Sequence, residues 1–477
     1  MFRAFKKFNP VHLLYRSLSN ASRSIPPKPG DTVYVGMSGG VDSSVSALLL
    51  KQRGLNVIGV YMQNWDTLDE SGTCNSQDDW LDVKAVCKSL DINCIKLNFS
   101  KEYWTKVFSV VLDGYSTGIT PNPDILCNSE IKFGCLLNKL FSLVPPERLG
   151  STWFATGHYA QVETVQESNP IAKIKPPSLS EHKPTEMATL LEIPASTTER
   201  HLLTRGKDRS KDQTYFLSGI SGLQLSRVLF PIGDLIKKTE VRDLAIKFNL
   251  KTAKKPESFG ICFVGNRKNF SKFLSEFIPP STDSNCLVVS ALDMKTVLGH
   301  HTGIYSKTIG QSAGVTFDSQ KWFVVDKDIE KNIIYAAPGH DHYLLYTQRI
   351  FLNTVHWINP INYSNYSSLS NTPQTDITRT FLRSNTHNPF SKINNNLKNS
   401  NIYASDSHIV LNLKYQIRHL ETPGNCSLVV SNNSSNAVVI FHSPVYGATS
   451  GQYIAFYDNN ICLGNASIAH VDVGFRL

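Results

Sequence analysis

The sequence predicts an α/β fold in which a parallel-sheet domain is followed by a small β-rich domain and a C-terminal β-barrel domain. Short apolar strands alternate with helix-like segments from residue 32 to about residue 250, as in the strand–helix–strand units that build parallel sheets. From about residue 270 onward helical periodicity fades, and turn residues separate short apolar or alternating runs. That texture is typical of small β domains, the last of them barrel-like.

The changes in texture define the domain boundaries that we expect. Residues 1–30 form a basic leader, residues 31–268 the parallel-sheet domain, residues 269–343 the central domain and residues 344–477 the barrel domain. An insertion dominated by Asn, Ser and Thr interrupts the barrel at residues 363–406 and is predicted to carry no catalytic group. A chain of 477 residues has room for two or three domains.

Composition excludes several classes of protein. Hydrophobic residues make up 41% and charged residues 18% of the chain, and no apolar run reaches the roughly 18–20 residues that a membrane span needs. The net charge of +9 is compatible with a nucleic-acid partner without being diagnostic of one. Nine scattered Cys form neither a disulfide framework nor a zinc site, and they favour a reducing compartment. We therefore expect no membrane association and no bound transition metal.

The leader is basic throughout and contains no acidic residue. Its six cationic side chains are Arg3, Lys6, Lys7, Arg16, Arg23 and Lys28. They account for six of the nine net positive charges, so 9 − 6 leaves +3 for the rest of the chain. A loosely amphipathic basic segment without a continuous apolar core predicts a mitochondrial transit segment and hence a matrix protein. The alternative is a basic N-terminus with no targeting role.

The first strand leads into a glycine-rich turn and then a helix. Thr32–Met37 is a β-branched and aromatic run that predicts a buried strand, and Val45–Arg53 is a helix pattern closed by Gly54. Between them, Gly39 and Gly40 permit positive φ and a close approach of the backbone to a ligand. The amide groups that converge at such a helix start suit a pyrophosphate or another anion.

The sequence of this turn is Ser-Gly-Gly-Val-Asp-Ser-Ser. It lacks the Lys that contacts the β- and γ-phosphates in a Walker loop. It resembles instead the PP-loop of ATP pyrophosphatases, enzymes that activate an oxygen by adenylation and release pyrophosphate. That resemblance implies a Rossmann-like nucleotide domain that binds ATP. It also implies that Asp42 helps to hold the Mg²⁺ that accompanies ATP, since a hard cation suits carboxylate and phosphate oxygens.

Further strands bring other residues to the same edge of the sheet. Val57–Met62, Asn93–Leu97 and Trp153–Ala160 are apolar runs, and the helix-like Asp79–Leu90 separates the first two. Ligands of parallel sheets lie at the carboxyl ends of the strands. Met62 at such an end is compatible with an adenine contact or with a plain core position. In the last run, Gly157 admits a nucleotide and His158 faces substrate, if that His is not merely structural.

Two cysteines stand in settings that favour reactivity. Pro residues at 121 and 123 force an extended turn before a helix that starts near Asp124, which puts Cys127 in its first turn, where the helix dipole and Lys132 favour a thiolate. Cys262 lies in a Gly-flanked turn between Lys254 and Lys255 on one side and Arg267 and Lys268 on the other. We expect Cys74, Cys87, Cys94 and Cys135 to be buried and inert.

Taken together, five motifs resemble those of one family, the tRNA-specific 2-thiouridylases of bacteria and mitochondria. The motifs are Gly36–Ser43, Asn122–Cys127, Gly157–Ala160, Lys211–Gln213 and Gly260–Phe263. The similarity extends over nearly the whole chain after residue 30. It implies ATP-dependent transfer of sulfur to C2 of the wobble uridine, which in a mitochondrion belongs to the tRNAs for Lys, Glu and Gln.

The resemblance also assigns roles, motif by motif. ATP would contact Gly36, Met37, Ser38, Gly39, Gly40, Val41, Asp42, Ser43, Met62 and Gly157. The target base would meet Asn122, Pro123 and Asp124. The rest of the tRNA would touch His158, Lys211, Asp212, Gln213, Arg418, His419 and Gln452, although His419 stands where the family usually has an aromatic residue.

The chemistry implied by the family uses both cysteines and one carboxylate. Adenylation turns the C2 oxygen into a good leaving group, and Cys262 would carry a persulfide from a cysteine desulfurase relay. Cys127 would either attack that persulfide to release sulfide or resolve it by forming a disulfide. Asp124 would act as a general acid or base, or orient the target base. A monomer is expected.

Two other readings remain open from sequence. A PP-loop ligase or amidotransferase would need neither Cys127 nor Cys262 and would keep its activity after thiol alkylation. A tRNA-binding or chaperone protein with a dead nucleotide loop would release no pyrophosphate when tRNA is added. The intact Ser38–Ser43 loop argues against the second reading.

Overall fold

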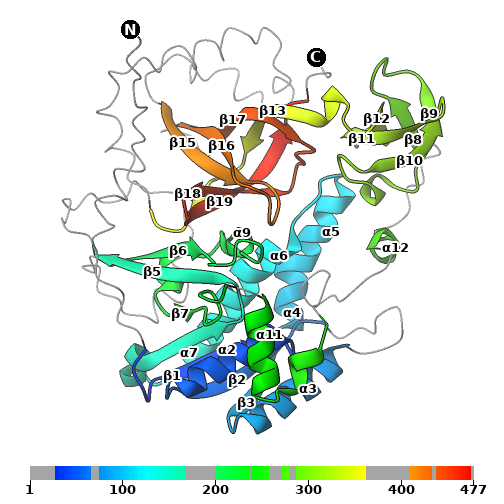
Figure 1. The fold of residues 1–477 in the computed structure, drawn as a ribbon. Helices are drawn as coiled ribbons and strands as arrows, with labels where there is room; N and C mark the ends of the chain where they lie inside the picture. The colour runs from blue at the N-terminus through cyan, green and yellow to red at the C-terminus, as the bar shows by residue number, and fades with distance from the viewer. Residues whose placement is uncertain are drawn as a thin grey trace, which may run out of the picture.

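The structure is a computed structural model that describes residues 27–65, 75–166, 199–236, 238–256, 270–278, 286–360, 408–431 and 437–473. Most of the leader, Cys262 and the insertion at residues 363–406 lie outside the described residues. Within them the chain forms a parallel sheet with flanking helices and two β domains stacked above it (Figure 1). The predicted α/β class and the two β domains are confirmed.

The first domain is built on a five-stranded sheet with the order β3-β2-β1-β4-β7. Its strands are β1 (Thr32–Met37), β2 (Asn56–Gln63), β3 (Asn93–Asn98), β4 (Thr152–Thr156) and β7 (Val228–Leu229), and every neighbouring pair is parallel. The strand that enters the glycine-rich turn, β1, is therefore the central one. Its carboxyl end lies beside those of β2 and β4, as the alternation of strands and helices predicts.

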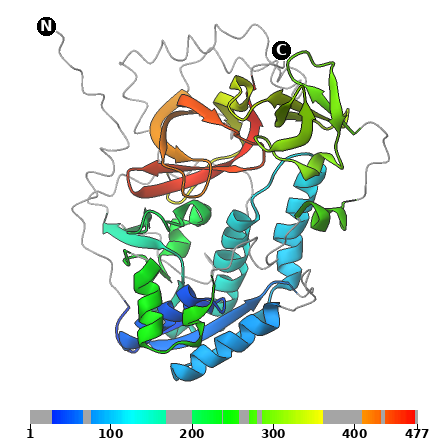
Figure 2. The ribbon, with the colours of Figure 1, turned by 45° about the vertical axis from the view of Figure 1, so that its right-hand side comes forward.

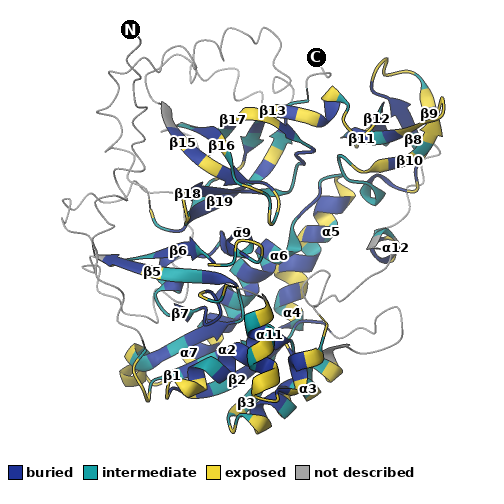
Figure 3. Cartoon of the chain, viewed as in Figure 1, coloured by how far each residue is buried: buried dark blue, intermediate teal, exposed yellow. Residues whose placement is uncertain are grey.

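Helices cover both faces of this sheet. On one face α2 (Val41–Gln52) and α3 (Asn75–Ser89) pack Ala47, Leu50 and Val86 against Val33 and Val35. Also in this domain are α11 (Lys238–Lys247), packed beside α2, and the short helices α9 (Thr214–Leu217), α10 (Gly222–Leu225), η3 (Pro146–Ser151) and η4 (Lys251–Lys254). Figure 3 shows buried residues along the strands and exposed residues on the outer side of α3 and α11.

Two helical columns cover the other face. The first is α4 (Ser100–Tyr103), η1 (Trp104–Phe108) and α5 (Ser109–Ser116), and the second is α6 (Pro123–Leu126), η2 (Cys127–Leu136) and α7 (Leu137–Ser142). Figure 2 shows both columns running from the sheet toward the β domains. The sequence prediction found only the start of the second column.

The central domain is a five-stranded sheet that contacts the top of the first column. Its strands are β8 (Leu287–Ser290), β9 (Val297–His300), β10 (Ser312–Phe317), β11 (Gln320–Asp328) and β12 (Ile333–Pro338), in the order β10-β11-β12-β8-β9; α12 (Phe270–Ser275) and η5 (Ile304–Ser306) accompany it. At the contact, the Lys327 ammonium donates to the Gly118 carbonyl at 3.1 Å. Burial lowers the pKa of Lys327 to about 8.

The last domain is a closed barrel of six strands. They are β13 (Tyr346–Leu352), β15 (His408–Gln416), β16 (Gly424–Ser431), β17 (Ala437–Tyr446), β18 (Tyr453–Asp458) and β19 (Ile461–Val471), and closure comes from β13, which pairs with both β17 and β19. The short β14 (His356–Trp357) adds to β19, and η6 (Tyr343–Leu345) precedes β13.

A hairpin from the first domain extends the barrel sheet. It consists of β5 (Ala160–Gln166) and β6 (Glu199–Arg205), and β6 pairs with β19 through Thr204 and Leu203. The expected domain boundary at residue 268 therefore falls between two strands, β6 and β19, that pair with each other in the folded chain. Local patterns do not reveal this pairing because the partners lie more than 250 positions apart.

No helix among the described residues is long and apolar enough to cross a membrane.

Candidate active site

The glycine-rich turn after β1 has the geometry of an anion site. Gly39 has φ +75°, and a Cβ there would lie 2.9 Å from the Asp79 carbonyl oxygen, so the position requires glycine. Gly40 is the N-cap of α2 in an extended conformation and supplies no side-chain cap to the first helical amides. Those donors are thus available to an anion at the positive end of a 12-residue helix. The residues present fit the phosphates of a nucleotide.

Around this turn the two serines bond to one another. The Ser43 hydroxyl accepts from the Ser38 amide at 3.2 Å and lies 3.3 Å from the Ser38 hydroxyl. Gly157, at the end of β4, packs against the same place, because a Cβ there would lie 2.7 Å from the Ser43 amide nitrogen. Gly157 is predicted to make room for a nucleotide. The structure shows that glycine at this position also makes room for the start of α2.

Tyr159 connects the turn to a second loop. Its hydroxyl donates to an Asp42 carboxylate oxygen at 2.9 Å, and its amide donates to the Gln213 side chain at 3.0 Å. The Gln213 amide donates back to the Tyr159 carbonyl at 2.9 Å. The Asp42 carboxylate is therefore held by the protein at the nucleotide turn. The described residues contain no cluster of three or more His, Cys, Asp or Glu side chains suited to a metal.

The second helical column begins with a capped turn. The Asn122 side chain accepts from the amides of Asp124 and Ile125 at 3.1 and 3.2 Å, and Pro123 follows it as the first helical residue. Such a cap satisfies the first orphan donors of the helix. The prediction of a helix that starts near Asp124 is confirmed, and the Asn122, Pro123 and Asp124 side chains are half-buried.

The barrel holds this turn from the other side. The Gln452 amide donates to the Thr120 carbonyl at 2.8 Å, and its oxygen lies 3.4 Å from the Asn122 amide nitrogen. The Ser450 carbonyl accepts from the Thr120 amide at 2.9 Å. Gln452, predicted to touch tRNA, thus also positions the residues predicted to meet the target base.

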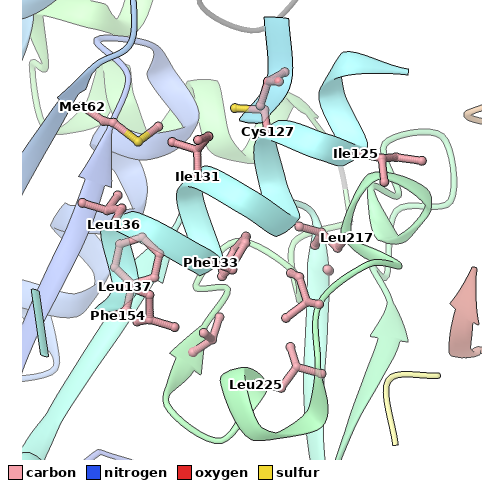
Figure 4. Packing of buried hydrophobic residues seen from close by; sticks show 14 of the residues in the cluster. Met62, Ile125, Cys127, Ile131, Phe133, Leu136, Leu137, Phe154, Leu217 and Leu225 are labelled. Atoms are coloured by element: carbon pink, nitrogen blue, oxygen red, sulfur yellow. The ribbon is translucent and has the colours of Figure 1, made fainter. Parts of the chain in front are cut away.

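The predicted setting of Cys127 is wrong in two respects. The helix begins at Pro123, so Cys127 is its fifth residue and lies beyond the first turn. The residue is 0% exposed and belongs to the core between the sheet and the barrel, together with Met62 and Ile131 (Figure 4). Cys127 and Ile131 are four positions apart and share the helix face that packs on the sheet. From sequence, Met62 is compatible with an adenine contact or with a core position. In the structure it lies in the core.

His158 is held as a neutral ring. Its Nδ1 lies 2.7 Å from the Thr156 hydroxyl, and its ring lies 6.1 Å from those of Phe133 and Phe230. Burial lowers the pKa of His158 well below its ordinary value, and the charge of Lys132 adds to that effect. A neutral imidazole has one donor and one acceptor nitrogen; with Nδ1 engaged by Thr156, Nε2 is left for one further hydrogen bond, and the ring contributes no charge to phosphate binding.

Asp212 points into the protein. Its side chain is 2% exposed, and its carboxylate accepts from Arg205 Nε at 2.7 Å, from the Gly206 amide at 3.0 Å and from the Thr214 hydroxyl at 2.9 Å. The sequence predicts that Asp212 touches tRNA, but in the structure its carboxylate is buried and bonded to groups of the protein. Lys211, next to it, is half-buried.

Arg418 and His419 are neighbours in the barrel domain but contact different segments. The Arg418 guanidinium donates to the carbonyls of Tyr446 and Gly447 at 2.7 and 2.8 Å, although the residue remains exposed. His419 Nε2 lies 2.9 Å from the Asp212 carbonyl. Burial lowers the pKa of His419, while the carboxylates of Asp212 and Asp124 act in the opposite direction.

The comparisons with known proteins agree with this arrangement. Residues 31–266 match the family described as tRNA methyl transferase HUP domain, residues 271–338 the tRNA methyl transferase PRC-barrel domain and residues 394–468 the aminomethyltransferase beta-barrel domain. The tRNA-specific 2-thiouridylase MnmA of Halalkalibacterium halodurans is 38% identical over 441 residues, which cover 92% of this chain and 95% of that protein. The chain belongs to the tRNA-specific 2-thiouridylase family.

Other matches add little to that assignment. The tRNA-specific 2-thiouridylase MnmA of Staphylococcus saprophyticus is 36% identical over 446 residues, with 92% of this chain and 95% of that protein covered. Among solved structures, the NMN synthetase of Francisella tularensis aligns with 55% of this chain and 77% of its own at 14% identity. Its TM-score of 0.25 is too low to bear on the fold.

For a 2-thiouridylase, the structure gathers most of the predicted residues in one place. Tyr159 joins the nucleotide turn to the loop before α9, and His419 of the barrel contacts that loop. Gln452 joins the barrel to the Asn122–Cys127 segment, whereas the hydrogen bonds of Arg418 stay within the barrel. Sequence reasoning missed Tyr159, which joins the nucleotide turn to the loop before α9, and Arg205, which holds Asp212 in that loop. Tyr159 belongs to the Gly157–Ala160 motif, which is the one signal that would have identified it.

Proposed function

We propose that this chain converts C2 of the wobble uridine of tRNA from a carbonyl to a thiocarbonyl, with ATP as the activating substrate. Membership of the 2-thiouridylase family supports the reaction class. The observation that carries the proposal is the run of contacts that connects an ATP-type turn, through Tyr159 and the loop before α9, to the barrel, and the barrel, through Gln452, to the capped helix bearing Cys127. A PP-loop ligase would have no use for Cys127 at that position.

Activation takes place at the nucleotide turn. The C2 oxygen of the base attacks the α-phosphorus of ATP, a P–O bond forms and pyrophosphate departs. The amides at the start of α2 receive the phosphate charge, and the Asp42 carboxylate is the group we assign to Mg²⁺. That ion, when bound, would neutralise charge on the departing pyrophosphate. The base is now linked to AMP, which is a good leaving group.

Sulfur then replaces AMP at C2. In this proposal Cys262 carries a persulfide received from a cysteine desulfurase relay. Either Cys127 attacks Cys262 Sγ, so that hydrosulfide leaves and displaces AMP, or the terminal sulfur attacks C2 first and Cys127 then breaks the S–S bond. Both routes end with a Cys127–Cys262 disulfide, which a thiol reductant must open before the next turnover.

Burial of Cys127 constrains these routes. A disulfide requires Cα atoms within roughly 7 Å of one another, and the two cysteines are 262 − 127 = 135 positions apart. Since Cys127 is 0% exposed, the proposal requires the pair to meet in a space that excludes water. Exclusion of water protects the adenylated base from hydrolysis.

The target is an anticodon base, which must leave the stack of its loop to be reached. The Asn122–Asp124 turn would receive the base, and Asp124 would act as a general acid or base, or orient the base. Arg418, Lys211 and the barrel would contact the backbone. We assign the tRNAs for Lys, Glu and Gln as substrates and the mitochondrial matrix as the compartment, on the basis of the basic leader.

The test uses the purified full chain with tRNA, ATP and a persulfide donor. We expect Cys127→Ser and Cys262→Ser to lose formation of 2-thiouridine. Cys426→Ser is the matched control, because Cys426 is also 0% exposed but lies in the barrel core, and it should retain activity. Wild-type rates from either Cys127→Ser or Cys262→Ser would overturn the proposed sulfur route.

Targeting is tested separately. We expect a chain lacking residues 1–28 to remain outside mitochondria while keeping its activity on tRNA in vitro. A shortened chain that still reaches the matrix would contradict the targeting proposal and leave the enzymatic one untouched.

A further inference from the structure

A buried asparagine lies against the Cys127 sulfur. Asn64 follows the carboxyl end of β2, two residues after Met62, and its side chain is 1% exposed. Its amide nitrogen lies 4.0 Å from Cys127 Sγ, in the outer range of an N–H···S hydrogen bond. The two residues are 63 positions apart in sequence, so the fold brings them together.

The neighbouring Trp65 fixes the backbone at this point. Its ring lies 4.7 Å from that of Phe108 and 6.0 Å from that of Tyr103, both in the first helical column. Trp65 itself is 8% exposed. The side chain of Asn64 is thereby held between the end of β2 and the second column.

The other end of the Asn64 amide has no partner in the described part of the chain. Its Oδ1 is buried and accepts no hydrogen bond there. A buried amide oxygen left in this state costs roughly 1–3 kcal/mol, and an asparagine kept only for core packing would normally satisfy both ends. Leucine would fill the same volume without that cost. The structure thus retains an unfavourable group whose side chain, among the described residues, bonds only to the predicted catalytic sulfur.

We propose that Asn64 is a positioning residue for Cys127, with its N–H group donating to the sulfur and favouring the thiolate. This inference rests on the proposed function of Cys127. A thiolate buried among apolar side chains is unfavourable unless a donor compensates it. Asn64 supplies such a donor without adding a second charge. Its oxygen remains available to an N–H or O–H donor that arrives with the substrate.

Removal of the donor should raise the pKa of Cys127. A hydrogen bond to a charged group changes a pKa by about one to two units, and the length of this contact favours the lower figure. For Asn64→Leu we expect the rising limb of the pH–rate profile to move up by about one pH unit. At neutral pH the rate should fall about tenfold and recover as the pH rises. Asn64→Asp should shift the limb further, because a like charge beside the sulfur disfavours thiolate.

Alkylation gives a second measurement that needs no activity. The pH dependence of iodoacetamide labelling, resolved for the Cys127 peptide by mass spectrometry, should shift in the same direction in both variants. Asn128→Leu is the matched control: Asn128 is 3% exposed, also has a buried Oδ1 without a partner in the described residues, and donates to the Phe216 carbonyl instead. It should leave the labelling profile of Cys127 unchanged.

An unchanged labelling profile in both Asn64→Leu and Asn64→Asp would overturn the inference. So would a shift of equal size in Asn128→Leu, since it would reflect general loosening of the core. If the wild-type protein forms no 2-thiouridine at any pH, the proposed function fails, but labelling of Cys127 still decides the role of Asn64.

Discussion

Asp212→Asn is expected to loosen the loop before α9 and not merely to weaken tRNA binding. The carboxylate of Asp212 is the centre of a buried cluster that joins β6, this loop and Thr214. Thr214 in turn lies 3.3 Å from the Tyr457 hydroxyl in β18. The substitution keeps the size of the side chain and removes its charge.

The magnitude follows from burial. The Asp212 side chain is 2% exposed and that of Arg205 is 11% exposed, with 2.7 Å between Oδ2 and Nε. Loss of one partner of a buried ion pair costs about 3–5 kcal/mol, since the other charge is left uncompensated. The asparagine oxygen keeps one acceptor for the Gly206 amide or the Thr214 hydroxyl. We therefore expect a cost of about 3 kcal/mol, or roughly a hundredfold in the opening equilibrium.

Native-state hydrogen exchange measures that opening. Amides in residues 199–217 should exchange about a hundredfold faster in Asp212→Asn than in the wild-type chain. Asp208→Asn is the control from the same loop: Asp208 caps only the local turn at Ser210, with 3.0 Å between its carboxylate and the Ser210 amide. Its effect should stay below about 1 kcal/mol.

The two possible roles of Asp212 give different results. If its carboxylate contacts tRNA directly, Asp212→Asn will raise KM for tRNA and leave hydrogen exchange unchanged, which would refute the reasoning. A double variant, Asp212→Leu with Arg205→Met, offers a further check. Removal of both charges should destabilise the loop less than Asp212→Asn alone.

Three further outcomes are expected. Gly157→Ala should raise KM for ATP about tenfold in a pyrophosphate-release assay, because its Cβ would meet the Ser43 amide at 2.7 Å and displace the start of α2; an unchanged KM would contradict the close packing. Burial lowers the pKa of Lys327 from 10.5 to about 8, so the unfolded chain binds more protons in that window and stability should rise with pH between them; urea titrations of Lys327→Met should lack this rise. Gln452→Leu should lower kcat for thiolation several-fold through loss of the bond to the Thr120 carbonyl, and a change confined to KM for tRNA would show that Gln452 acts only as a tRNA contact.

Much of the first domain was predictable because its signals are local. Thr32–Met37 alternates between the two covered faces of the sheet, and Gly39 stands where a positive φ is needed. Each of these features depends on residues within a few positions of one another. The same holds for the capped turn at Asn122, where two prolines and an asparagine mark a helix start.

The rest depends on contacts between distant segments. Nothing near Cys127 indicates that the helix face carrying it packs on the sheet, so a polar surrounding sequence gave the wrong expectation of its burial. Nothing near Asp212 indicates that Arg205 folds back over it. The pairing of β6 with β19 and the closure of the barrel by β13 are likewise set by tertiary packing. Asn64 gave no signal in sequence, since its contact with Cys127 exists only in the folded chain.

The most direct test of the account is mass spectrometry of nucleosides from tRNA of cells lacking this protein, after incubation with the purified chain. Our account predicts that 2-thiouridine appears at the wobble position only when ATP and a sulfur donor are both present, with AMP and pyrophosphate released in equal amount. Thiolation without ATP, or ATP cleavage with no sulfur in the tRNA, would contradict it.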